Sequence, residues 1–144
     1  MISVPAYIPV NLKDQIQQQD RGRCCYCLTQ EINSGIALSF DHILPQSRGG
    51  TTSFENVCLA CRSCNEFKSD QVEAIDPLIG ERVSLFHPRQ QSWHEHFTWS
   101  EDGTRVEGLS AMGRATVLAL QLNHTTIVVA RRRWVASGWH PPAD

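Results

Sequence analysis

The sequence contains no apolar run near the roughly 20 residues that a membrane-spanning helix needs, so we expect no membrane partner. It also lacks low-complexity tracts and internal repeats, which excludes a disordered or a repeat protein. The N-terminal MISVPAYIPVNLKD has no basic head and is interrupted by prolines, which predicts an extended arm and not a signal peptide. We therefore expect a cytoplasmic protein, and a reducing compartment weakens a disulfide interpretation of its six cysteines.

The sequence has no excess of basic residues, since 13 Lys and Arg against 15 Asp and Glu give a net charge of -2. Overall charge therefore does not indicate a nucleic-acid-binding protein. The basic residues are nevertheless unevenly distributed. They gather around the cysteine-rich segment and after Gly103: Arg21, Arg23, Arg48, Arg62, Lys68, Arg105, Arg114, Arg131, Arg132 and Arg133. Such local patches can bind phosphates even on a slightly acidic chain.

The chain length suits one domain, because 144 residues with 41% hydrophobic content can bury a single core. Helices and strands are mixed along it, so the fold class is predicted as α+β. The sequence predicts a helix over residues 11–19, a half-buried strand over 34–43, a helix from 62 to 74 or 75, and two C-terminal helices over 110–123 and 125–138. A β-hairpin is expected before those two helices. Its turn is Asp102-Gly103, and it pairs Trp99 with Val106 and Phe97 with Gly108.

Four cysteines have the paired spacing of a structural zinc site: Cys24, Cys27, Cys61 and Cys64. The 33 residues between Cys27 and Cys61 exceed the usual zinc-finger spacing, so this insert must hold structure of its own. Two alternatives stay open, because Cys25 could replace Cys24 and Cys58 has the same spacing to Cys61. We favour Cys61 and Cys64 because they begin the expected helix, whereas Cys58 lies in an apolar run.

An Asp-His pair lies inside the insert and is followed at short distance by two asparagines. The order is DHILPQSRGG over 41–50, ENV over 55–57 and CRSCNEFK over 61–68, with RCCYC over 23–27 upstream. This pattern resembles the HNH endonuclease family, whose ββα-metal motif is built around a four-cysteine zinc site in many members. The resemblance covers roughly residues 20 to 70 and depends on residue type, spacing and order together.

The resemblance implies an active site that uses a divalent ion to hydrolyse phosphodiester bonds of DNA, and the expected substrate is double-stranded. His42 would be the general base, because a neutral imidazole can activate water near neutral pH. Asp41 and Asn65 would hold Mg²⁺ or Mn²⁺, since hard cations prefer oxygen ligands, and Asn56 would brace the loop that orients His42. The family name implies a third-position His where this chain has Asn65, which leaves the preferred ion open.

Other basic and imidazole residues have weaker claims to a function. Arg48, Arg62 and Lys68 lie beside the proposed site in sequence and are candidates for phosphate contact. His94 and His96 are expected as exposed residues on the outer face of the hairpin. The three arginines over 131–133 cannot all face one groove from a helix, so a solvated face is as good an interpretation as DNA binding.

The sequence therefore predicts a zinc-stapled HNH core over residues 20–75, with an N-terminal helix, inside a single domain of residues 1–144. Residues 76–144 form a C-terminal extension that packs on the core. The alternative function is a non-catalytic zinc-stapled module that binds nucleic acid or protein. A zinc deaminase is set aside because no H-x-E signature is present. A homodimer is attractive for double-strand cleavage.

Overall fold

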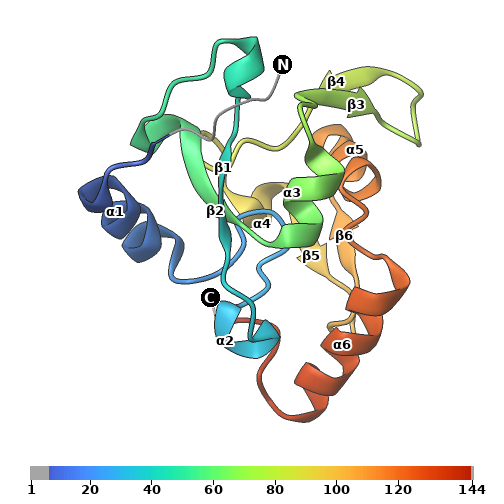
Figure 1. Ribbon diagram of the computed structural model, residues 1–144. Helices are drawn as coiled ribbons and strands as arrows, with labels where there is room; N and C mark the ends of the chain where they lie inside the picture. Colours follow the sequence, from blue (N-terminus) through green and yellow to red (C-terminus); the bar gives the residue numbers. More distant parts are fainter. Residues whose placement is uncertain (1–6, 144) are drawn as a thin grey trace.

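The computed structural model describes residues 7–143 and shows a mixed α+β fold, as predicted (Figure 1). Residues 1–6 of the predicted extended arm lie outside these residues, and its end is not extended, because α1 already begins at Val10. In chain order the elements are α1 Val10–Asp20, α2 Glu31–Ser34, β1 Ser39–His42, η1 Gln46–Arg48, η2 Phe54–Asn56, β2 Val57–Ala60, α3 Arg62–Lys68, β3 Glu73–Ile75, β4 Arg82–Ser84, α4 Trp93–His96, β5 Phe97–Trp99, β6 Val106–Gly108, α5 Ala111–Ala119 and α6 Thr125–Ala136. No helix within 7–143 combines the length and apolar character needed to cross a membrane.

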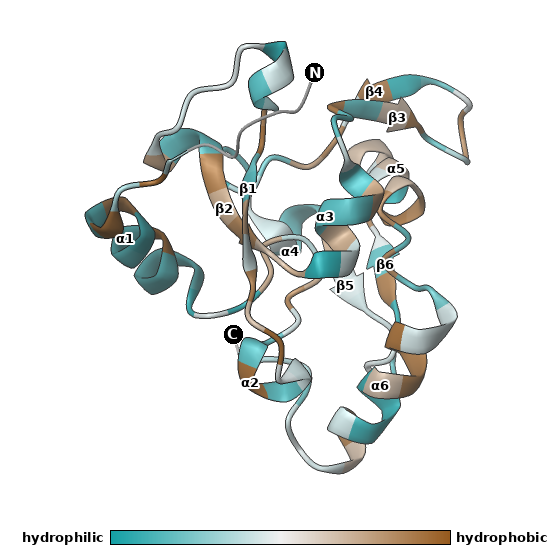
Figure 2. Ribbon diagram, viewed as in Figure 1, coloured by the Kyte–Doolittle hydropathy of each residue, from teal (hydrophilic) through white to brown (hydrophobic). Residues whose placement is uncertain are grey.

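The centre of the cysteine-rich half is the antiparallel pair of β1 and β2. Asp41 faces Cys58 across the pair, and His42 faces Val57 at its end. Every residue of β2 is buried, in keeping with its apolar sequence VCLA, and the strand is correspondingly hydrophobic in Figure 2. Helix α1 packs against β2 and α3 packs against β1, so the strands lie between two helices.

The free edge of β2 is closed by an ion pair that the sequence did not predict. Arg89 binds both carboxylate oxygens of Asp20, with Nη1–Oδ1 at 2.6 Å, and donates to the carbonyls of Phe54 and Val57. Asp20 in turn accepts the Leu59 amide at 2.9 Å. The guanidinium also stacks on the Phe54 ring, 4.4 Å from its centroid. These contacts fix the turn that leads into β2.

Helix α3 is shorter than predicted, because it ends at Lys68 and not near residue 75. Ser69 leaves the helix with φ of 50°, although its amide still bonds to the Asn65 carbonyl. Residues Glu73–Ile75 form β3 and pair with β4. The prediction failed because a ladder to a distant strand replaced the local helical hydrogen bonds.

The β5–β6 hairpin has the predicted register, with Trp99 opposite Val106 and Phe97 opposite Gly108. Its turn is wider than the predicted Asp102-Gly103 pair, because the Asp102 carboxylate accepts hydrogen bonds from Thr104 and opens the loop.

Residues 93–96 form the short helix α4, so the prediction of His94 and His96 on a strand face was wrong. His94 is exposed, whereas the ring of His96 bonds to Ser110 at 2.7 Å, the residue that caps α5. The imidazole of His96 is therefore bound to the residue that caps the neighbouring helix, α5.

Helix α6 lies where the sequence placed it, whereas α5 ends at Ala119 and not near the predicted Asn123. Ser110 caps α5 by accepting the Gly113 amide, as predicted. The larger buried cluster takes residues from both halves of the chain, for example Tyr26 and Cys58 from the first and Phe97 and Leu122 from the second. The C-terminal half thus packs directly on the cysteine-rich half.

Candidate zinc and active site

The sulfurs of Cys24, Cys27, Cys61 and Cys64 come together within 4.8 Å of one another. Cys27 Sγ and Cys61 Sγ are 3.6 Å apart. Tetrahedral coordination at about 2.3 Å per Zn–S bond requires sulfurs about 3.8 Å apart, so the cluster fits one zinc ion. Three of the four thiols are buried, which makes the site closed and structural in type.

Two local turns position these sulfurs so that they point toward a common centre. Residues 24–29 fold back on themselves, with the Cys24 amide bonded to the Thr29 carbonyl and Leu28 in the left-handed region at φ of 60°. Cys61 is the N-cap of α3, and its sulfur accepts the Cys64 amide at 3.4 Å. The pKa of Cys27 lies well below the usual range because neighbouring cysteines donate hydrogen bonds to it, whereas burial raises the pKa of Cys24. An anionic sulfur is what zinc requires.

Neither alternative ligand belongs to the cluster. Cys58 is fully buried in β2, and its thiol lies 3.8 Å from the hydroxyl of Tyr26. Cys25 is half-buried, and its amide bonds to Leu59 on the β2 edge. The predicted ligand set is therefore the one that the fold brings together.

Asp41 and His42 end β1 and face different surroundings. Asp41 is buried, and its Oδ2 accepts the hydroxyl of Tyr26 at 2.8 Å and lies 3.3 Å from the Lys68 ammonium. Burial raises the pKa of Asp41, while Lys68 and Tyr26 oppose that shift. His42 is half-exposed, and its Nε2 lies 2.9 Å from Thr52 Oγ1. Tyr26 and Thr52 were not predicted, because nothing in their sequence context marks them as partners of this pair.

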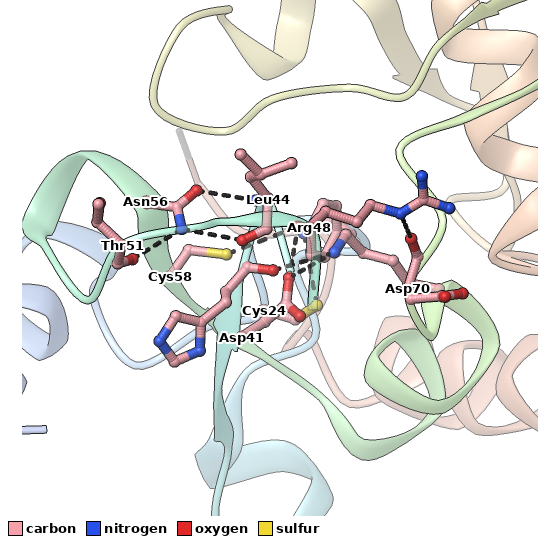
Figure 3. Close-up of polar contacts among 11 residues, drawn as sticks. Cys24, Asp41, Leu44, Arg48, Thr51, Asn56, Cys58 and Asp70 are labelled. Atoms are coloured by element: carbon pink, nitrogen blue, oxygen red, sulfur yellow. Dashed lines mark hydrogen bonds and ion pairs between the residues drawn. The ribbon is translucent and has the colours of Figure 1, made fainter. Parts of the chain in front are cut away.

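Asn56 ties together the loop that follows His42 (Figure 3). Its Oδ1 accepts the Leu44 amide at 2.8 Å, and its Nδ2 donates to the carbonyls of Leu44 and Thr51. The loop that carries Thr52 is thereby held against the end of β1. Arg48 in the same loop donates to the Asp70 carbonyl at 2.8 Å and so connects it to the segment after α3.

Gly50 is required where this loop crosses Leu44. A Cβ there would collide with the Leu44 carbonyl and lie 2.9 Å from Asn56 Nδ2. We expect Gly50→Ala to lower the free energy of unfolding by about 1–3 kcal/mol, as overpacking does, and to displace the Asn56 side chain. Urea unfolding measures this loss. Ser47→Ala, an exposed change in the same loop, is the control and should leave the midpoint unchanged.

Helix α3 presents Asn65 and Lys68 on one face, because residues three apart are neighbours on a helix. Lys68 is buried and reaches Asp41 and the His42 carbonyl. Among residues 7–143, no hydrogen bond joins the side chains of Asn65 and Asp41. Of the three predicted phosphate-binding residues, Arg48 and Arg62 are exposed, and Arg62 pairs with Glu66 at 3.0 Å. Lys68 instead supports Asp41.

Two antiparallel strands are followed by a helix. A cysteine cluster lies at the start of the helix, and an Asp-His pair lies at the end of the first strand. This arrangement defines a zinc-stapled ββα-metal fold. Residues 24–75 match the family model described as HNH endonuclease. The match covers less than half of the chain and confirms the resemblance stated from the motif. No curated protein matches the chain.

Proposed function

We propose that the protein is a metal-dependent DNA endonuclease whose general base is His42. The observation that carries this proposal is the position of His42. It stands half-exposed at the end of β1, beside Asp41, in a loop braced by Asn56 within the segment that matches the HNH endonuclease family. A base for hydrolysis must be fixed in direction and reachable by water. His42 meets both requirements.

The hydrogen bond to Thr52 is compatible with either tautomer of His42, and the proposal requires the one with Nε2 protonated. With Nε2 protonated and donating to Thr52 Oγ1, Nδ1 carries the lone pair that takes a proton from the attacking water. Burial lowers the pKa of His42 below its ordinary value of 6.5, so the ring is neutral at physiological pH. A neutral ring is the form that a general base needs.

Asp41 and Asn65 would hold the divalent ion, Mg²⁺ or Mn²⁺, through carboxylate and amide oxygens, a donor set that suits hard cations. Such an ion, when bound, supplies positive charge for the phosphoryl and leaving oxygens. Lys68 and Tyr26 already bind Asp41 Oδ2, which orients the carboxylate and offsets part of its charge. We therefore expect weak binding of the ion in the absence of DNA.

A plasmid assay tests the proposal. Supercoiled plasmid is incubated with wild-type protein and with His42→Ala, each with Mg²⁺, with Mn²⁺ and with chelator. We expect nicked or linear product from the wild type only, and only with an added ion. Equal cleavage by His42→Ala would overturn the assignment of the base. The proposal also includes double-stranded DNA as the substrate, a homodimer for double-strand cuts and a cytoplasmic setting.

Thr52→Val should lower the cleavage rate, because it removes the hydroxyl that fixes the His42 ring and keeps the side-chain shape. A hydrogen bond of about 0.5–1.5 kcal/mol predicts a loss up to about tenfold. Single-turnover cleavage of a short duplex measures it. Thr52→Ser retains a hydroxyl and should recover most of the rate, and a Val variant as fast as wild type would contradict the role of Thr52.

One observation favours the alternative, a zinc-stapled module that binds nucleic acid without cleaving it. The Asp41 carboxylate is buried and already paired with Lys68, as a purely structural ion pair would be. DNA binding without cleavage in any divalent ion would support this alternative. Cleavage lost in His42→Ala with DNA binding retained would refute it.

A further inference from the structure

Arg131 in α6 is a fully buried cation in the C-terminal half of the chain. Its Nη1 donates to the Thr104 carbonyl at 3.0 Å, and its Nη2 donates to the Leu122 carbonyl at 2.7 Å. The guanidinium also lies over the ring of Trp99, 5.3 Å from its centroid. Two of the three guanidinium nitrogens thus donate to neutral groups. These groups do not neutralise the positive charge of the guanidinium.

The third nitrogen, Arg131 Nε, is buried and has no hydrogen-bond partner. No carboxylate among residues 7–143 pairs with this guanidinium. A buried charge without a counter-ion costs several kcal/mol, and a buried N–H without an acceptor adds to that cost. A group on the protein or bound to it is therefore needed to offset the charge.

The cysteine cluster is the group that can supply this negative charge. Arg131 lines the same cavity of about 430 Å³ as Cys27, Cys61 and Cys64. Four thiolates around one Zn²⁺ carry a net charge of 2−, so a zinc-loaded cluster is the anion that the guanidinium lacks.

We propose that Arg131 is the charge partner of the four-cysteine zinc site and that its unpaired Nε donates a hydrogen bond to a sulfur of the zinc-loaded cluster. Donors to metal ligands hold those ligands in place and tune the metal, and their loss costs about 10- to 100-fold in metal affinity. Arg131 lies outside residues 24–75, the segment that matches the family. The C-terminal extension therefore completes the metal site, independently of any nuclease activity.

Zinc release tests the proposal on the folded, zinc-loaded protein. An excess of a chromophoric chelator is added under native conditions, and the rate of zinc transfer is followed. We expect Arg131→Met to release zinc at least about tenfold faster than wild type. Arg131→Lys keeps the positive charge and should recover most of the retention. Arg133→Met, an exposed change two residues away on α6, should behave as wild type.

Asn123→Ala separates this role from a loss of general stability. Asn123 accepts a bond from Arg131 Nη1 and bonds both backbone groups of Val106, so its loss disturbs the same packing without touching a sulfur. We expect a lower melting temperature but slow zinc release. Faster release from Asn123→Ala and Arg131→Met alike, a wild-type rate in Arg131→Met, or an Arg131→Lys protein as fast as the Met variant would each overturn the proposal.

A cobalt-loaded sample gives a second readout, an absorption band that does not depend on the stability of the fold. The sulfur-to-metal charge-transfer band reports on electron density at the thiolates, which a hydrogen-bond donor lowers. Arg131→Met should shift this band to lower energy, and Asn123→Ala should leave it unchanged. An unshifted band in Arg131→Met would contradict a direct hydrogen bond to sulfur.

Discussion

Cys61→Ala is expected to abolish zinc binding and to unfold most of the cysteine-rich half. Structural zinc contributes on the order of 10 kcal/mol to the folding of small zinc domains, whereas whole domains are stable by only about 5–15 kcal/mol. Cys61 is also the N-cap of α3, so its loss removes a cap together with a metal ligand. Neither Cys58, which lies against Tyr26 on β2, nor Cys25 belongs to the cysteine cluster, so neither thiol is placed to compensate.

Metal analysis and thermal melting measured by circular dichroism check this expectation. The wild type should carry one zinc per chain and should melt at a lower temperature after chelation. Cys25→Ala is the matched control, since it removes a neighbouring half-buried thiol outside the cluster. A Cys61→Ala protein that stays folded with full zinc content would refute the assigned ligand set.

His42→Ala should lower the rate of plasmid cleavage by about 10²- to 10⁴-fold, the usual contribution of a general base. The side chain is half-exposed and, within residues 7–143, bonds only to Thr52, so the fold and DNA binding should survive the change. His94→Ala, which removes an exposed imidazole from α4, should cleave at the wild-type rate. Melting temperature and gel-shift affinity, measured alongside, separate a loss of chemistry from a loss of structure.

The pH dependence of cleavage follows from the same residue. Burial lowers the pKa of His42, so the neutral base persists to a pH below 6.5 and is lost only as the pH falls through that lowered value. The wild-type rate should therefore rise with pH from acid conditions and level off before neutrality. The residual activity of His42→Ala should lack this acid limb. A midpoint above 6.5 in the wild type would contradict the direction of the shift.

Local spacing accounts for what could be predicted from the sequence. The zinc ligands and the register of the β5–β6 hairpin depend on residues a few positions apart, and both were placed correctly. The partners of Asp41 could not be predicted, because Tyr26 and Lys68 reach it from separate elements. The same reason explains Arg131, a buried cation that the sequence could not distinguish from its two exposed neighbours.

The free edge of β2 is protected against pairing with another chain. The outward backbone groups of Val57 and Leu59 are occupied by Arg89, Asp20 and the Cys25 amide. An open strand edge is a template for association and aggregation, and a buried ion pair across it prevents a third strand from adding. A homodimer of this protein would therefore not form by adding a strand to the β2 edge of this sheet.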